Sequence, residues 1–258
     1  MRFLSSDRPV LVFPDVSTLA RAAAEQILSS VEDAVRARGA FRCALAGGKT
    51  PRSIHSAVVR AGGLSSTARV APWDLWFGDE RCVPSDDVDS NYRMVSESLL
   101  SSLRPVPTVH RVPTELGLPS AVAAAYEAEL FRAFALRAGE VPVFDLILLG
   151  VGSDGHTASL FPGDPTLEEP IRLVVAVRSP KPPLDRVTLT LPVLCAARVV
   201  IIVVSGADKA AALRAVLESG STLPAARVRP THGRLFTFAD ADAASLLPPG
   251  LESVAWPP

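Results

Sequence analysis

The sequence predicts an α/β fold: a Rossmann-like, doubly wound, mostly parallel β-sheet with helices on both faces. First, short apolar runs alternate with longer, Ala-rich segments of helical period, as in stacked β-α units. Second, the apolar runs are rich in β-branched and aromatic residues and show little polar alternation, which is typical of strands buried on both faces. Third, unusual polar residues follow these runs directly. We expect residues 1–258 to form a single domain.

Helices are predicted where apolar residues recur with a helical period. The clearest covers residues 15–38, in which apolar side chains recur every four residues from Leu19 to Val35 and Gly39 follows as a stop. Further helices are predicted at 51–60, 91–102, 119–138 and 208–218. Pro-rich segments near 104–119 and 162–183 are typical of loops.

Strands are predicted at the apolar runs between these helices. They cover residues 41–46, 74–77, 109–112, 144–149, 173–177, 187–191, 198–204 and 234–238. Polar segments follow five of them directly, after residues 46, 77, 149, 177 and 204. The carboxyl ends of parallel strands share one edge of the sheet, where ligands bind. We therefore expect these five loops to converge on one site.

Composition excludes several classes of function. The chain has 258 residues, is 48% hydrophobic, and carries 26 basic and 27 acidic residues without a long run of one sign. This supplies a large core and indicates no nucleic-acid surface. The three cysteines are widely spaced and lack a C-x-x-C pair, so they indicate a reducing compartment and neither a disulfide framework nor a zinc site.

Membrane insertion is not indicated either. Residues 1–10 contain Ser, Asp and Arg where a signal peptide would be apolar, and the apolar run at 199–204 is too short to span a bilayer. We expect a soluble, cytoplasmic protein.

The first polar loop, AGGKTP, is suited to bind phosphate. Gly47 and Gly48 permit a sharp turn and close approach of a ligand, while Thr50 and Pro51 are expected as the N-cap and first residue of the next helix. Such a helix start offers free N–H groups to an anion, and Lys49 adds a positive charge. A plain strand-to-helix turn is the alternative, and this segment alone does not decide between them.

The second loop, GDER, concentrates charge after a strand that should be buried. Carboxylates of Asp79 and Glu80 are suited to position a polar substrate or a water, and Arg81 is suited to hold a phosphate. A surface charge cluster is the more common meaning of such a run, but the position after a buried strand favours function.

The third loop, GVGSDGH, has the G-x-G-x-x-G spacing of a dinucleotide fingerprint over residues 150–155. Pro162 interrupts the following helix too early, and no acidic residue ends the next strand, so the nucleotide interpretation is weak. A tight turn at Asp154 that presents His156 at the sheet edge explains the segment better. Histidine is a natural general base near neutral pH. A metal site is the weaker interpretation and none is predicted, because no second His or Cys lies at ligand spacing; Asp ligands from other loops are the alternative left open.

Two further loops contribute cations. Lys181 and Arg186 belong to a Pro-bounded loop, where a solvated charge is nearly as good an explanation as ligand binding. Lys209 is expected in the first turn of a helix, where a cation opposes the helix dipole. That mismatch indicates an anionic ligand.

Taken together, these motifs resemble the 6-phosphogluconolactonase family. The resemblance runs from about residue 10 to about 245 through AGGKTP, GDERCVPSDDVDSN, LGVGSDGHTASLFPG, SPKPPLDRVTLT, SGADKAAAL and LPAARV. DGHTASLFPG and SPKPP are its most specific parts. The wider glucosamine/galactosamine-6-phosphate isomerase superfamily includes glucosamine-6-phosphate deaminases. Both groups imply a Rossmann-like fold without a nucleotide.

The resemblance implies hydrolysis of 6-phospho-D-glucono-1,5-lactone to 6-phospho-D-gluconate, the second step of the oxidative pentose phosphate pathway, without a metal or redox cofactor. It makes His156 the general base, with Asp79 and Asp154 at the catalytic centre. The residues it implies for the substrate phosphate are Gly47, Gly48, Lys49, Thr50, Arg81 and Lys209. The family usually has Ser at the position of Ala46 and often Ser at that of Lys49.

Three alternatives are weighed against this. Deaminases typically have Tyr at the position of Arg81 and LAFNEPG where this chain has TASLFPG, so the Glu they use is missing. A non-catalytic phosphosugar sensor would not need Asp79 and His156, and a dinucleotide-dependent oxidoreductase would need the missing fingerprint. We expect a small-molecule phosphosugar lactone as the only partner, and a monomer or homodimer.

Overall fold

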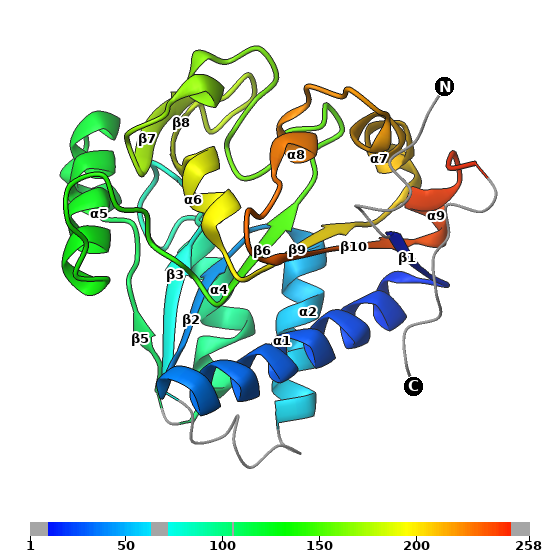
Figure 1. Ribbon diagram of the computed structural model, residues 1–258, viewed down its shortest axis with the longest axis horizontal. Coiled ribbons are helices and arrows are strands. Elements are labelled where there is room, and N and C mark those ends of the chain that lie inside the picture. Colours follow the sequence, from blue (N-terminus) through cyan, green and yellow to red (C-terminus); the bar gives the residue numbers. More distant parts are fainter. Residues whose placement is uncertain (1–9, 63–71, 105, 249–258) are drawn as a thin grey trace.

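The computed structural model describes residues 10–62, 72–104 and 106–248, and its centre is a seven-stranded parallel sheet (Figure 1). The strand order is β1-β10-β9-β6-β2-β3-β5. The strands are β1 (Val10–Phe13), β2 (Phe41–Leu45), β3 (Trp73–Phe77), β5 (Thr108–Val109), β6 (Leu146–Gly150), β9 (Val199–Val204) and β10 (Arg234–Asp240). The sheet confirms the predicted fold class. Residues 1–10, whose sequence does not predict a signal peptide, lie outside the described residues except for Val10.

The direction in which strands are added reverses between β2 and β6. From β2 the chain adds β3 and β5 on one side, then returns to place β6 on the other side and continues through β9 and β10. β2 and β6 pair through Cys43 with Leu146 and Ala44 with Ile147. The segments that follow these two strands diverge, so a crevice opens above their carboxyl ends.

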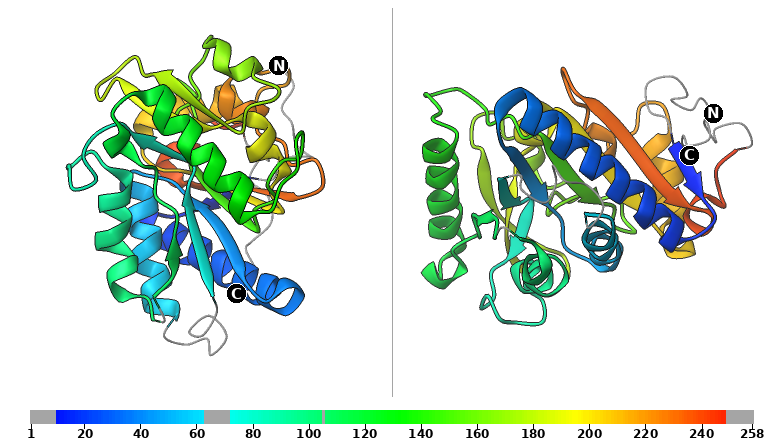
Figure 2. Two further views of the ribbon diagram at one scale, coloured as in Figure 1. Left: turned by 90° about the vertical axis from the view of Figure 1, so that its left-hand side faces the viewer. Right: turned by 90° about the horizontal axis from the view of Figure 1, so that it is seen from below.

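Helices cover both faces of the large sheet, as expected. On one face α1 (Val16–Arg38) packs against α2 (Lys49–Gly62), which contacts α4 (Asn91–Ser98). The other face carries α6 (Leu191–Ala196), α7 (Ala210–Leu217) and α8 (Pro224–Arg227), and the two layers are separated in Figures 1 and 2. Two more helices are α5 (Pro119–Ala133) and α9 (Ala241–Ala244). Short 3-10 turns are η1 (Leu100–Ser102), η2 (Thr114–Leu116), η3 (Pro165–Glu168) and η4 (Ala207–Lys209).

Helix α1 has clear start and stop signals. The Asp15 carboxylate accepts the backbone N–H of Thr18 at 2.7 Å and caps the first turn. Gly39 takes the left-handed conformation at φ 78° and donates its N–H to the Val35 carbonyl. These signals explain why the predicted helix and the observed one agree within a residue.

A second, three-stranded antiparallel sheet differs from the predicted arrangement. It contains β4 (Asp79–Arg81), β8 (Asp185–Leu189) and β7 (Val174–Arg178), in the order β4-β8-β7. We expected the last two strands in the parallel sheet and the first as a loop. The segment between β7 and β8 is too short for a parallel crossover, which needs a dozen or more residues, so these strands form a hairpin.

Gly78 joins the two sheets. Its N–H donates to the Leu45 carbonyl of the large sheet at 2.8 Å, and its carbonyl accepts the Leu189 N–H of the small sheet at 2.9 Å. Just before it, the buried Tyr126 hydroxyl of α5 bonds both the N–H (2.8 Å) and the carbonyl (3.1 Å) of Phe77. These bonds fix the path of the chain into Asp79.

Several element limits also differ from the prediction. The helix predicted to reach residue 138 ends at Ala133, and the strand predicted at 109–112 pairs only as β5. The sequence reasoning missed β1, α6, α8 and α9, which are six residues long or shorter. Such short segments carry too few residues for a periodic pattern.

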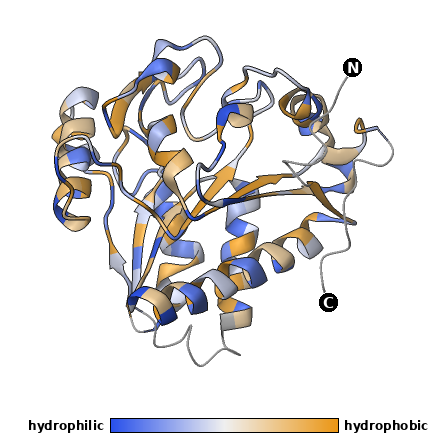
Figure 3. Cartoon of the chain, viewed as in Figure 1, coloured by the Kyte–Doolittle hydropathy of each residue, from blue (hydrophilic) through white to orange (hydrophobic). Residues whose placement is uncertain are grey.

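The core is continuous through the large sheet, where apolar colour concentrates in Figure 3. Every residue of β9 is buried, and so are Trp76, Phe144 and Leu148. Burial on both faces explains why the strand sequences lack polar alternation.

One buried histidine should make the stability depend on pH. His55 of α2 is 1% exposed, and its Nδ1 lies 2.9 Å from the Ser98 hydroxyl of α4. Burial, with the charge of Arg52 acting the same way, lowers the His55 pKa from 6.5 to about 4. Between about pH 6.5 and pH 4 the unfolded chain therefore binds a proton on the His55 imidazole, whereas the folded protein keeps this imidazole neutral. We expect stability to fall as the pH drops from 6.5 towards 4, by up to about 3 kcal/mol.

Urea unfolding of the wild type and His55→Leu at about pH 7 and about pH 5 checks this expectation. Between pH 7 and pH 5 the unfolding free energy of the wild type should fall by about 2 kcal/mol relative to that of His55→Leu. A difference that does not change with pH would contradict it.

Candidate active site

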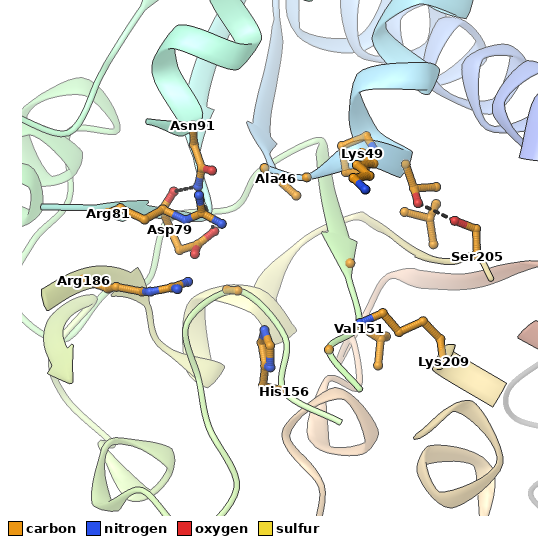
Figure 4. Close-up of a pocket in the computed structure, with 18 of the residues that line it drawn as sticks. Ala46, Lys49, Asp79, Arg81, Asn91, Val151, His156, Arg186, Ser205 and Lys209 are labelled. Carbon is orange, nitrogen blue, oxygen red and sulfur yellow. Dashed lines mark hydrogen bonds between the residues drawn. The ribbon is translucent and has the colours of Figure 1, made fainter. Parts of the chain in front are cut away.

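A cavity of about 500 Å³ lies at the carboxyl edge of the large sheet, at the point where β2 and β6 diverge (Figure 4). Segments that follow β2, β3, β6 and β9 line it, together with β8 of the small sheet. Eight of the ten residues predicted for the site line this cavity: Gly47, Gly48, Lys49, Thr50, Asp79, Arg81, His156 and Lys209. Four of the five loops expected to converge therefore do so.

His156 is oriented by Asp154. The imidazole Nδ1 lies 2.5 Å from Asp154 Oδ1, which also accepts the His156 backbone N–H at 3.1 Å. Partial burial disfavours the Asp154 charge, but the hydrogen bonds and charge of His156 outweigh it and lower the Asp154 pKa. An ionised carboxylate holds the proton on Nδ1, which leaves the Nε2 lone pair available for the cavity. Asp154 does not line the cavity but contacts His156, which does.

The glycines of this loop serve the histidine. A Cβ on Gly152 would lie 2.0 Å from His156 Nδ1, so only glycine leaves room for the ring. Gly155 takes a positive φ of 83°, and a Cβ there would lie 2.8 Å from Leu223. The ring also packs against Phe161, with centroids 4.9 Å apart. In the spacing that resembles a dinucleotide fingerprint, Gly152 therefore makes room for His156 and Gly155 for Leu223.

Strand alternation decides which charges of GDER reach the cavity. In β4, Asp79 and Arg81 face the cavity, whereas Glu80 points the other way because alternate residues of a strand face opposite sides. The buried Glu80 carboxylate accepts the N–H groups of Arg81 (2.8 Å), Asn91 (2.7 Å) and Tyr92 (2.8 Å). Burial raises the Glu80 pKa, although these N–H groups act in the opposite direction. Glu80 thus ties β4 to the start of α4 and does not contact a ligand.

Asp79 is held by two residues that the sequence reasoning did not assign to the site. It is 7% exposed, and its Oδ2 accepts the Ser159 hydroxyl at 2.7 Å. Asn91 donates its side-chain amide to the Asp79 carbonyl at 2.8 Å and lines the cavity. A Cβ on Gly47 would lie 1.8 Å from Asn91 Oδ1, so Gly47 makes room for this amide. No local pattern in the sequence identifies such contacts between distant segments.

Two arginines face the cavity from neighbouring strands, close to the Asp79 carboxylate (Figure 4). Arg81 of β4 and Arg186 of β8 are direct cross-strand partners, an arrangement that is unfavourable for like charges. Both guanidinium groups point into the cavity in Figure 4, and within the described ranges neither forms an ion pair. Arg186 is 8% exposed; burial and then the Arg81 charge lower its pKa. An anionic ligand would relieve this repulsion.

The opposite side of the cavity carries two lysines. Helix α2 begins at Lys49, so the predicted N-cap, Thr50, lies inside the helix; its hydroxyl instead bonds Ser205 Oγ at 2.6 Å. Lys209 ends η4 and immediately precedes α7, as expected for a cation at a helix start. Its amine has an exposed neighbour, Asp208, at 3.6 Å. The two lysines and the first turn of α2 form a cationic wall opposite the arginines (Figure 4).

Lys181 is not brought to the cavity. It lies in the hairpin between β7 and β8, where its backbone N–H and carbonyl bond the Ser179 hydroxyl at 3.2 and 2.7 Å. The fifth predicted loop belongs to the small sheet and not to the carboxyl edge of the large one. Arg186, which the sequence left open, takes its place in the cavity wall because it pairs with Arg81.

The described ranges contain neither a metal cluster nor a membrane helix. Among these residues no group of three or more His, Cys, Asp or Glu side chains is arranged to hold a metal ion. None of the helices described is both long and apolar enough to cross a bilayer.

The fold and the site define an α/β protein with a cation-lined cavity beside a carboxylate-oriented histidine at the switch point of a parallel sheet. The model of the family described as glucosamine-6-phosphate isomerases/6-phosphogluconolactonase matches residues 14–237. This chain belongs to that family.

Relatives agree with this assignment. The 6-phosphogluconolactonase of Rattus norvegicus is 44% identical over 90% of this chain and 89% of its own length. The structure of 6-phosphogluconolactonase from Trypanosoma cruzi superposes with a TM-score of 0.83 at 29% identity, covering 96% of this chain and 99% of that one. A monomeric glucosamine-6-phosphate deaminase shares the fold, with a TM-score of 0.75 at 19% identity over 92% of this chain and 99% of its own.

Gly152→Ala should displace the His156 ring. The new Cβ would overlap Nδ1, so the ring must move or the loop must shift, at a cost of about 1–3 kcal/mol in stability. We expect the imidazole NMR signals of His156 and their pH titration to change, and the melting temperature to fall. Gly150→Ala is the matched control, because no atom lies within 4 Å of its added Cβ. Unchanged His156 signals in Gly152→Ala would contradict this account.

Proposed function

We propose that the protein hydrolyses 6-phospho-D-glucono-1,5-lactone to 6-phospho-D-gluconate, the second step of the oxidative pentose phosphate pathway. The observation that carries the proposal is the Asp154–His156 pair, with Nε2 available to a cavity walled by cations on two sides. Relatives named 6-phosphogluconolactonase support this substrate. The enzyme is a carboxylic ester hydrolase that uses a general base.

The histidine activates water. His156 Nε2 takes a proton from a water molecule as the water oxygen attacks C1 of the lactone. The tetrahedral intermediate then collapses, the bond from C1 to the ring oxygen breaks, and His156 returns the proton to that oxygen. General acid–base catalysis of this kind contributes roughly 10²- to 10⁴-fold in rate. Asp79, held beside the cavity by Ser159 and Asn91, orients the water or a substrate hydroxyl.

The two cationic walls of the cavity bind opposite ends of the substrate. We assign the phosphate to the lysine wall, where Lys49, Lys209 and the free N–H groups of the first turn of α2 converge and Gly48 allows close approach. The sequence also assigned Arg81 to the phosphate. Its position beside Asp79, across the cavity from Lys49 in Figure 4, favours contact with the lactone end, where the product carboxylate appears.

Location and assembly are part of the proposal. We infer a reducing, cytoplasmic location, supported by Cys43 and Cys82, which form no disulfide among the described residues. Burial raises the pKa of Cys82 to about 11, so this thiol stays protonated. We further propose a single domain, supported by a family match that spans both sheets, and a monomer or homodimer.

His156→Gln and Asp154→Asn should both reduce turnover of freshly made 6-phosphogluconolactone in a pH-stat assay. Without the base, kcat is expected to fall about 10²- to 10⁴-fold. Asp154→Asn no longer stabilises the productive tautomer, so a loss of similar size is expected. His232→Gln, at an exposed histidine, is the control and should retain wild-type turnover. Full activity in His156→Gln would refute the catalytic role.

Lys209→Ala should separate phosphate binding from chemistry. Loss of one charge-assisted hydrogen bond is expected to raise KM for the phosphorylated lactone about 10- to 100-fold. The rate on unphosphorylated gluconolactone should not change. Arg178→Ala, which removes an exposed cation of β7, controls for general charge effects. Equal losses on the two substrates would count against the phosphate assignment.

Lys181→Ala, measured in the same assay, tests the assignment made from sequence alone. A KM increase matching that of Lys209→Ala would mean that the hairpin closes onto the phosphate. An unchanged KM is expected from the position of Lys181 outside the cavity.

A further inference from the structure

Two alanines, Ala135 and Ala158, have positive φ angles, 52° and 48°. This left-handed conformation costs an L-residue about 1–2 kcal/mol, so it needs an explanation. Ala135 follows the end of α5, where a left-handed residue commonly terminates a helix, and its N–H bonds the Arg132 carbonyl at 3.3 Å. Ala158 has no such explanation, because it lies in the turn that follows His156.

The neighbours of Ala158 hold it in this conformation. Thr157 and Ser159 are both fully buried. The Thr157 hydroxyl donates to the Gly150 carbonyl at 2.8 Å, and the Ser159 hydroxyl donates to the Asp79 carboxylate at 2.7 Å. The Ser159 N–H bonds the Thr188 hydroxyl at 3.3 Å. With both flanking residues fixed, Ala158 cannot relax to a negative φ without breaking contacts to Asp79 or to β6.

The backbone N–H of Ala158 is a donor at the cavity that these contacts leave without an acceptor. In this turn the N–H groups of His156, Ser159 and Leu160 bond Asp154, Thr188 and the Thr157 carbonyl respectively. For Ala158 no acceptor is found within residues 10–62, 72–104 and 106–248. The residue lines the cavity with His156 and Asp79, and its methyl group is the smallest side chain that an L-residue can have.

We propose that the Ala158 N–H is an oxyanion donor of the lactonase reaction, which rests on the function proposed above. As water adds to C1, its proton moves to His156 Nε2 and the carbonyl π electrons move onto the carbonyl oxygen. That oxygen, now negative, accepts the Ala158 N–H. When the intermediate collapses, the electron pair reforms the carbonyl, the ring C–O bond breaks, and the ring oxygen takes the proton from His156. The strained turn thus aims one amide at the position where charge develops.

The arginine pair does not replace this donor. Arg81 and Arg186 face the cavity from the small sheet and attract the anionic substrate and product throughout the reaction. A fixed backbone amide instead discriminates between the neutral carbonyl and the oxyanion, because its hydrogen bond strengthens as the charge grows.

The test replaces one backbone N–H group by an oxygen atom. Replacing Ala158 by lactic acid converts the preceding amide into an ester, which deletes the N–H and keeps the methyl group. Loss of an oxyanion donor should lower kcat on 6-phosphogluconolactone about 10²- to 10³-fold, with KM within about threefold of wild type. The matched control is the same replacement at Ala135, the other left-handed alanine, which lies outside the cavity and should keep wild-type kcat. Ala158→Gly retains the N–H and should stay within about tenfold.

The outcomes are separable. A folded ester variant at position 158 with kcat within about threefold of wild type overturns the proposal, and so does an equal loss at position 135. A wild-type protein without turnover on this lactone overturns the proposed function itself. If the ester variant does not fold, the amide proton of Ala158 is followed by NMR in the wild type as 6-phosphogluconate is added. A downfield shift supports the hydrogen bond, and an unmoved signal overturns it.

Discussion

The parallel pairing of β2 with β6 is the constraint on which the rest of the structure depends. Strands are added in opposite directions from this pair, so the segment that follows β2 runs to the α1–α2 face and the segment that follows β6 runs to the opposite face. Between these diverging segments the sheet edge stays open, and the start of α2 lines the cavity there. His156 follows β6 at this opening and Lys49 follows β2, while Asp79 follows Gly78, which links the opening to the small sheet.

The small antiparallel sheet sets the charge of the cavity. Period-two alternation turns Asp79 and Arg81 inward, while Glu80 turns outward to bind the start of α4. Pairing with β8 then places Arg186 opposite Arg81. The two guanidinium groups repel each other, and the hydrogen bonds of Glu80 to the start of α4 hold β4 in place despite this repulsion. The site is therefore electrostatically incomplete without an anion.

The sequence predicted those features that leave a local pattern. Periodicity identified α1, and burial on both faces identified β6 and β9. Tight-turn chemistry at Asp154 led to His156. Interactions across long sequence separations leave no such pattern, which is why Ser159, Asn91 and the hairpin position of Lys181 were not predicted. The alternation of Asp79 and Arg81 around Glu80 was readable, but it required recognising a three-residue strand that was taken for a loop.

The unpaired arginines also affect how the free protein interacts with its surroundings. The buried Arg186 and the half-buried Arg81 face two lysines across the cavity, so we expect phosphate or sulfate in a buffer to compete with the substrate for it. The substrate then has to displace the inorganic anion, and its apparent affinity falls as the concentration of that anion rises. Rates measured in phosphate or sulfate buffers will accordingly underestimate the affinity that the same protein has in a chloride or zwitterionic medium.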